Sequence, residues 1–201
     1  MTDRRRHDRF RDFLRAFSEL IDANPPEEVI LDRGAQHLRA LVSSDDWLDD
    51  QFAAADSTYY QQFLLYADAR ERFSVVSFVW GPNQFTPIHN HTVWGLIGVL
   101  RGAETSQAFK WNGPGQLIEN GPPTRLSQGT VEAVSPRIGD IHQVRNALTN
   151  RVSISIHVYG ANIGAVRRSV FKEDGSEKLF ISGYSNTVLP NPWDISKEQQ
   201  D

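Results

Sequence analysis

Two different hydrophobic patterns divide the chain. From Phe10 to Ile21, apolar residues recur three and four positions apart, which places them on one face of a helix. Pro25 and Pro26 end this segment, residues 27–42 predict a second helix, and a third short helix is expected over 45–52. Residues 1–58 therefore read as a helical preface.

Short β-prone runs replace the helical pattern after Tyr59. Turns rich in glycine and proline separate them, and we expect the stretch 112–123 to be a surface loop. Many short strands without intervening helices are typical of an antiparallel sandwich or barrel. We expect strands over residues 63–66, 73–80, 93–100, 108–111, 131–134 and 152–159.

The chain of 201 residues is expected to form a single, mainly β domain. Its composition, 39% hydrophobic and 23% charged, provides enough apolar side chains for a sizeable core. We assign the helical preface to 1–58, a β-barrel to 59–189, and an extended acidic tail to 190–201.

Charge and cysteine content narrow the possible functions. A net charge of -4 provides no overall positive field, so we expect a small-molecule partner, no nucleic acid and no membrane. With no cysteine, the chain cannot form disulfides, zinc–thiolate sites or a cysteine nucleophile. No apolar run approaches the roughly 20 residues that span a bilayer, and no signal-like segment follows the start, so we expect a cytoplasmic protein.

Three of the six histidines form a pattern typical of a metal site. His89 and His91 are two residues apart, a spacing that places both on one face of a strand. His142, from a neighbouring strand, would complete a facial set of three nitrogen ligands. Such a set leaves open coordination positions for other molecules.

The residues around these histidines resemble the two-part signature of the cupins. That resemblance implies a double-stranded β-helix, which is a jelly-roll-like barrel. One departure is Gly95, which stands where the cupin pattern has a glutamate ligand. Three neutral ligands leave a divalent metal its full charge, which favours an anionic ligand such as a thiolate. The matching residues outside the histidines are Gly81, Gly102, Gly129, Pro136, Gly139 and Asn146.

Further segments resemble the cysteine dioxygenase family of cupins, which are non-haem iron enzymes that add both atoms of O2 to a thiol. The matching segments are 60–62, 87–92, 139–146 and 155–159. The resemblance implies that His89, His91 and His142 bind Fe(II). It also implies that Ser155, His157 and Tyr159 form a hydrogen-bonded relay beside the metal.

The residues of 152–159 support a strand without reference to the family. Polar Ser153, Ser155, His157 and Tyr159 alternate strictly with apolar residues, which predicts a half-buried strand. Its polar face would meet water in an ordinary sheet, or would line the cavity of a barrel with a buried metal. In the second case Tyr159 could donate its hydroxyl proton, with His157 orienting it.

Two departures from the animal cysteine dioxygenases concern the substrate and the tyrosine. Gly95 falls where those enzymes carry a cysteine that crosslinks to the active-site tyrosine, so Tyr159 must act as an unmodified phenol. Gln62 replaces the arginine that pairs with the carboxylate of cysteine. Glutamine there resembles the bacterial 3-mercaptopropionate dioxygenases, which implies that Arg168 binds the carboxylate, with Tyr60 and Gln62 in support. Arg167 is the rival.

The predicted function is therefore oxidation of a small carboxylated thiol, 3-mercaptopropionate, to its sulfinic acid by Fe(II) and O2. The first alternative is an L-cysteine dioxygenase with the same chemistry. Others are a zinc hydrolase or hydratase with the same ligands, and a non-catalytic metal-binding cupin that acts as a sensor.

Overall fold

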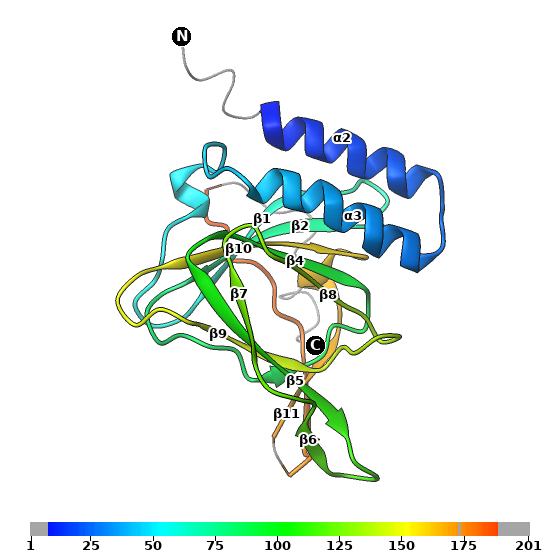
Figure 1. Ribbon diagram of the computed structural model, residues 1–201, viewed down its shortest axis with the longest axis vertical. Coiled ribbons are helices and arrows are strands. Elements are labelled where there is room, and N and C mark those ends of the chain that lie inside the picture. Colours follow the sequence, from blue (N-terminus) through cyan, green and yellow to red (C-terminus); the bar gives the residue numbers. More distant parts are fainter. Residues whose placement is uncertain (1–7, 173, 189–201) are drawn as a thin grey trace.

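Two helices cover one side of a β-barrel. The computed structural model describes residues 8–172 and 174–188, and the predicted tail at 190–201 lies outside them. Helices α2 (Asp8–Asp22) and α3 (Glu27–Val42) form an antiparallel layer above the barrel (Figure 1). In the described part of the chain, neither helix has the length and apolar character needed to cross a bilayer.

The third predicted helix is largely wrong. Only a single 3-10 turn, η1 (Asp50–Phe52), forms within 45–52. Trp47 is buried there, and its indole N–H donates to the Leu41 carbonyl at 3.2 Å. Arg101 holds Asp45 in an ion pair at 2.6 Å. These contacts hold the segment against the core and the barrel, and it does not form a regular helix.

In the described part of the chain, twelve strands form two antiparallel sheets. One sheet has the order β1-β2-β10-β4-β8, and the other has the order β12-β11-β3-β9-β5-β6, with β7 also paired to β5. The strands are β1 (Gln61–Ala67), β2 (Ser74–Trp80), β3 (Ile88–His89), β4 (Gly95–Arg101), β5 (Ala103–Trp111), β6 (Leu117–Glu119), β7 (Thr124–Ser127), β8 (Val131–Val134), β9 (His142–Asn146), β10 (Ser153–Tyr159), β11 (Arg168–Phe171) and β12 (Glu177–Phe180).

The order of the strands confirms the predicted fold class. From β2 to β5 and again from β8 to β11, consecutive strands alternate between the two sheets. A chain that winds in this way builds a double-stranded β-helix, in which two curved sheets enclose a barrel interior. Each of the six predicted strands is present, but the expected loop at 112–123 contains β6.

Glycines allow α3 to approach the barrel closely. A Cβ atom on Gly98 of β4 would lie 2.9 Å from Leu38 Cγ, and one on Gly34 of α3 would lie 2.8 Å from Leu96 Cδ1. Real Cβ atoms essentially never approach so closely, so side chains at these positions would force the layers apart. The helices thereby seal the outer face of the sheet that contains β10.

Strand β10 is buried on both faces, which corrects the prediction of a half-buried strand. It lies between β2 and β4, at the centre of its sheet. Ile154, Ile156 and Val158 join the hydrophobic core beneath the helices. The polar residues point into the barrel and are equally buried, so the polar face does not meet bulk water.

Candidate metal centre

Three histidine side chains converge inside the barrel. His89 of β3 pairs directly with His142 of β9, and His91 follows two residues after the short strand β3. The potential ligand nitrogens of the three rings lie within 4.8 Å of one another, and each pair of ring centroids is 4.9 Å apart. These residues could therefore hold a metal ion.

His91 reaches the cluster through a turn rather than along a strand. Strand β3 ends at His89, and Thr92 has a positive φ of 61°. Asp140 holds this turn, because its carboxylate accepts the backbone N–H groups of His91 at 3.0 Å and of Thr92 at 2.9 Å. The predicted convergence is present, although the expected strand geometry is not.

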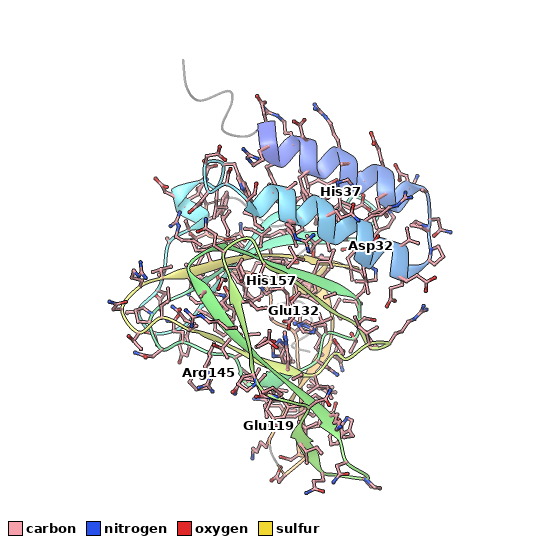
Figure 2. All side chains as sticks on the ribbon, in the orientation of Figure 1. Asp32, His37, Glu119, Glu132, Arg145 and His157 are labelled. Carbon is pink, nitrogen blue, oxygen red and sulfur yellow. The ribbon has the colours of Figure 1, made fainter. Side chains whose placement is uncertain are left out.

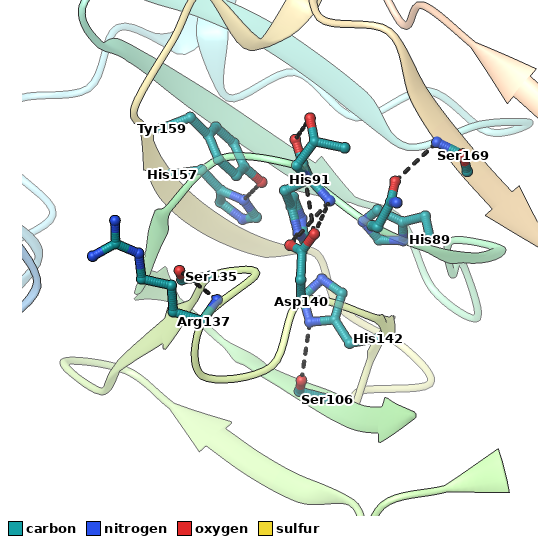
Figure 3. Close-up of polar contacts among 12 residues, drawn as sticks. His89, His91, Ser106, Ser135, Arg137, Asp140, His142, His157, Tyr159 and Ser169 are labelled. Atoms are coloured by element: carbon teal, nitrogen blue, oxygen red, sulfur yellow. Dashed lines mark hydrogen bonds and ion pairs between the residues drawn. The ribbon is translucent and has the colours of Figure 1, made fainter. Parts of the chain in front are cut away.

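The second nitrogen of each ring has its own partner. Nδ1 of His89 lies 3.0 Å from the Pro87 carbonyl. Figure 3 shows the contact of His91 with Asp140, in which Nδ1 lies 2.9 Å from Oδ1. Nδ1 of His142 lies 3.4 Å from Ser106 Oγ. Polar partners at Nδ1 leave Nε2 of every ring for the cluster, as in protein metal sites.

The ring atoms and their protonation fit a metal ion. His91 Nε2 is buried and has no hydrogen-bond partner among the described residues. Burial lowers the pKa of His89 and His142 well below its usual range, and burial also lowers the pKa of His91. All three imidazoles are therefore neutral, which is the form that binds metals.

Asp140 is a part of the site that the sequence analysis missed. Burial raises the pKa of this carboxyl, but the His91 ring and the backbone N–H groups outweigh burial, and the net pKa lies below the usual range. An ionised Asp140 fixes the orientation of the His91 ring. The only sequence feature that pointed to Asp140 was its position two residues before His142.

The predicted relay is a continuous hydrogen-bonded chain. Ser155 Oγ lies 2.8 Å from His157 Nε2, and His157 Nδ1 lies 2.8 Å from Tyr159 Oη. The indole N–H of Trp80 donates to Ser155 Oγ at 3.2 Å. Burial raises the pKa of Tyr159 far above its usual value, so the phenol keeps its proton.

Gly95 makes room for the Tyr159 ring. A Cβ atom at this position would lie 2.8 Å from Tyr159 Cδ1 and Cε1, and 3.0 Å from Val134 Cγ2. The absence of a side chain therefore does more than remove a carboxylate ligand. It leaves room for the phenol ring next to β4 and beside the His91 ring.

A pocket of about 250 Å³ opens beside the histidines. Tyr60 and Gln62 line it as predicted, and the Tyr60 ring stacks on Trp80 with centroids 4.8 Å apart. Its other lining residues are Phe78, Trp80, Thr86, Pro87, His89, His142, Val144, His157, Tyr159, Arg168, Val170, Lys178, Phe180 and Ser182. A cavity of this size suits a small molecule.

Arg168 and Arg167 have opposite surroundings. Arg168 lies at the start of β11, is only 4% exposed and lines the pocket, whereas the side chain of Arg167 is exposed. Nη2 of Arg168 donates to Ser182 Oγ at 2.7 Å, and its guanidinium lies 4.7 Å from the Phe180 ring centroid. Its buried Nε has no partner in the described part of the chain.

Solved structures with similar folds are cupins and related double-stranded β-helix proteins, and no family model matches the sequence. An uncharacterised protein with a double-stranded β-helix domain from Klebsiella pneumoniae has a TM-score of 0.45 and 16% identity, over 65% of this chain and 91% of that one. A cupin 2 conserved barrel protein from Rhodopseudomonas palustris has a TM-score of 0.44 and 16% identity, over 61% and 75%.

A third similar structure is an RmlC-like cupin from Desulfovibrio desulfuricans, with a TM-score of 0.40 and 20% identity over 53% of this chain and 88% of that one. The winding of the two sheets itself defines the class. The described residues form a cupin fold in which two helices precede the barrel, and the barrel contains a three-histidine cluster that could hold a metal ion.

Proposed function

We propose that this protein is a non-haem iron(II) thiol dioxygenase that converts 3-mercaptopropionate and O2 to 3-sulfinopropionate. One observation carries the proposal. Two histidines of the cluster, His89 and His142, line a single small pocket together with the Tyr159 end of the relay and a buried arginine that has no carboxylate partner among the described residues. The resemblance to the cysteine dioxygenases supplies the reaction, in which both oxygen atoms add to sulfur and the thiol becomes a sulfinic acid.

The three histidines would hold Fe(II) through Nε2. Iron bound there would supply the redox chemistry that joins dioxygen to sulfur. The chain's own contribution is a neutral ligand set, kept in orientation by Asp140 and Ser106. Gly95 stands where the cupin pattern has a carboxylate ligand, so the ligand set carries no negative charge. The site therefore attracts an anionic thiolate.

Arg168 binds the carboxylate of the substrate. Arginine stays protonated in proteins, and no described carboxylate forms an ion pair with this buried guanidinium. A carboxylated ligand would neutralise that charge and satisfy the free Nε. With its two ends held, the thiol faces the histidines in one orientation.

The pocket favours 3-mercaptopropionate over L-cysteine. The two molecules differ by the α-ammonium group of cysteine. Among the described lining residues none is Asp or Glu, and two, Arg168 and Lys178, are cationic. An ammonium group in this pocket would lose hydration without gaining an ion pair.

The relay supplies a proton at a fixed place. Tyr159 Oη is held by His157, and the ring lies against the His91 ring with centroids 5.3 Å apart. Since its pKa is raised, the phenol acts as a neutral hydrogen-bond donor or acceptor beside the reacting atoms.

Oxygen consumption by the iron(II)-loaded protein tests the proposal, with 3-mercaptopropionate, L-cysteine and cysteamine in parallel and the sulfinate products identified. We expect the highest kcat/KM for 3-mercaptopropionate. Preference for cysteine would show that the carboxylate pocket is misassigned. No oxygen uptake with any thiol, in protein that holds iron, would overturn the proposal and favour a zinc enzyme or a sensor.

Two adjacent arginines provide a matched pair of variants. Arg168→Met should raise KM for 3-mercaptopropionate by roughly 100-fold or more while changing KM for cysteamine little, because cysteamine has no carboxylate. Arg167→Met removes the same charge from the exposed neighbour and should leave both KM values nearly unchanged. Equal effects of Arg168→Met on the two thiols would remove its assigned role.

A further inference from the structure

A carboxyl group that has no role in the proposed reaction lies inside the barrel. Glu104 of β5 is fully buried, and its Oε1 accepts a hydrogen bond from Ser153 Oγ at 3.1 Å. Its Oε2 is also buried and has no hydrogen-bond partner among the described residues. Burial of an ionised carboxylate with a bare oxygen is costly, so this group needs an explanation.

Glu104 lies at the far end of the relay from the pocket. The Ser155 hydroxyl and the Trp80 indole N–H face its carboxyl, and Ser155 is the first member of the chain to Tyr159. Figure 2 shows Glu132 and His157 inside the barrel, whereas Asp32 and His37 lie on the helix outside it. The relay therefore ends on a buried acid.

The titratable groups that face Glu104 come from two strands. Glu132 on β8 repels the negative charge of Glu104. On β10, Ser155 connects Glu104 to His157 and Tyr159. Its cross-strand neighbours on β9 and β7, Asn146 and Leu126, are uncharged. Burial raises the pKa of Glu104 to about 7, against the opposing effect of the two serines and Trp80. Both protonation states are thus accessible near neutral pH.

The neutral acid gives one arrangement of protons. A proton on Glu104 Oε2 would give this unpartnered oxygen a hydrogen to donate, and Ser155 Oγ, which faces the carboxyl, would be the acceptor. Ser155 Oγ also accepts the Trp80 N–H. Ser155 then donates to His157 Nε2, and His157 carries its proton on Nδ1 and donates to Tyr159 Oη. The Tyr159 O–H is left free to donate into the pocket.

The ionised carboxylate reverses every bond of the chain. Glu104 can then only accept, so the Ser155 hydroxyl donates to it. Ser155 Oγ accepts from Trp80 and from a proton on His157 Nε2. His157 Nδ1 becomes an acceptor and takes the Tyr159 O–H, so Tyr159 presents a lone pair to the pocket. The Ser155 hydroxyl and both ring nitrogens of His157 are hydrogen-bonded in both states.

We propose that Glu104 is a positioning residue whose protonation sets the direction of the hydrogen-bonded chain, and thereby decides whether Tyr159 donates or accepts in the pocket. It touches neither substrate nor metal ligands, and acts through Ser155 and His157. The direction of the chain is independent of the proposed function, whereas its effect on turnover rests on that function.

The tautomer of His157 is the direct readout. In full-length protein labelled with ¹⁵N-histidine and loaded with diamagnetic zinc, long-range NMR spectra distinguish the protonated from the unprotonated ring nitrogen. The spectra of His157→Gln identify the signals. We expect Nδ1 of His157 to carry the proton at pH 5.5 and Nε2 to carry it at pH 8.5, with a midpoint near the pKa of about 7. A single tautomer throughout would overturn the proposal.

Two amide variants separate Glu104 from its neighbour. Glu104→Gln still donates to Ser155 but does not titrate, so it should hold the low-pH tautomer over the whole range. Glu132→Gln removes the repelling charge, so the switch should remain and its midpoint should move to lower pH. A switch that persists unchanged in Glu104→Gln would overturn the proposal. If that variant does not fold, an unmoved midpoint in Glu132→Gln would overturn it equally.

Turnover distinguishes this inference from the proposed function. If the reaction uses the Tyr159 proton, kcat of the iron-loaded wild type should fall as pH rises through the tautomer midpoint, and kcat of Glu104→Gln should be flat there. A tautomer switch without the change in kcat would leave the inference intact and would count against the proposed role of Tyr159.

Discussion

The two faces of β10 are equally buried but are held in different ways. On the outer face, Ile154, Ile156 and Val158 pack against the helical layer. On the inner face, Ser155, His157 and Tyr159 are joined end to end by hydrogen bonds of 2.8 Å. Burial alone therefore does not distinguish structural from chemical residues in this strand.

The difference lies in what each face tolerates. Apolar packing has no directional requirement, so its loss costs stability in proportion to the area and the cavity that results. A buried polar chain needs a donor and an acceptor at every step, so its loss changes protonation and chemistry. Changes on the outer face should thus affect stability, and changes on the inner face should affect function.

The largest expected effect comes from removing a ligand inside the barrel. His142→Ala should weaken metal binding by more than about 100-fold, since two ligands remain. Metal analysis after equilibration with Fe(II) and dialysis measures the loss. His37→Ala, on helix α3 outside the barrel, is the control and should keep full metal content (Figure 2). Undiminished metal in His142→Ala would contradict the site.

On the outer face, Ile156→Ala should lower the free energy of unfolding by about 2–5 kcal/mol, because the side chain is fully buried. Urea denaturation measures this loss. The folded variant should bind metal with unchanged stoichiometry. If Ile156→Ala kept normal stability but did not bind metal, the outer face would contribute to function rather than to stability, contrary to the prediction.

The buried acid should link stability to pH. Because the pKa of Glu104 is raised to about 7, the neutral acid contributes stability that is full below its unfolded pKa and is lost as pH rises through 7. One pKa unit corresponds to about 1.4 kcal/mol of unfolding free energy. Between pH 4 and pH 8.5, the unfolding free energy of Glu104→Gln should therefore rise by roughly 3 kcal/mol relative to that of the wild type. Urea denaturation at both pH values measures it.

The exposed Glu119→Gln serves as the control for this pH series, because its carboxyl lies at the end of β6 in water. It should show the same pH dependence as wild type. An equal relative gain in both variants would show that Glu104 is not the source.

The smallest expected effects compare two glycines of the same strand. Gly95→Ala would press on the Tyr159 ring, and Gly98→Ala would press on Leu38 in the helical layer. Each should cost about 1–3 kcal/mol through overpacking. Only Gly95→Ala should also lower kcat, because it displaces the phenol. Equal kcat values in the two variants would show that the phenol tolerates displacement.

Local patterns predicted the parts of the molecule that have a clear period. The alternation of 152–159 located β10, and the His-x-His pair with His142 located the metal-ligand cluster. Strand β3, of only two residues, has no readable period. Arg167 and Arg168 differ in exposure because β11 begins at Arg168, and no local pattern specifies where this strand begins.

Buried carboxylates were the main omission. Asp140 and Glu104 are acidic residues of the kind that usually lie at the surface, and nothing in their immediate sequence separates them from exposed acids. Their roles come from partners far along the chain, such as His91 for Asp140 at a separation of 49 residues. Only the closed barrel brings these groups together.

The central place of β10 also determines when the barrel can close. Trp80 and Ser155 are hydrogen-bonded neighbours although 75 residues separate them, and β10 must insert between strands made much earlier. Contacts this distant in sequence make folding slow, whereas the α2–α3 pair is local and can form first. On a ribosome, the relay and the sheet would be completed together, only after β10 has been made.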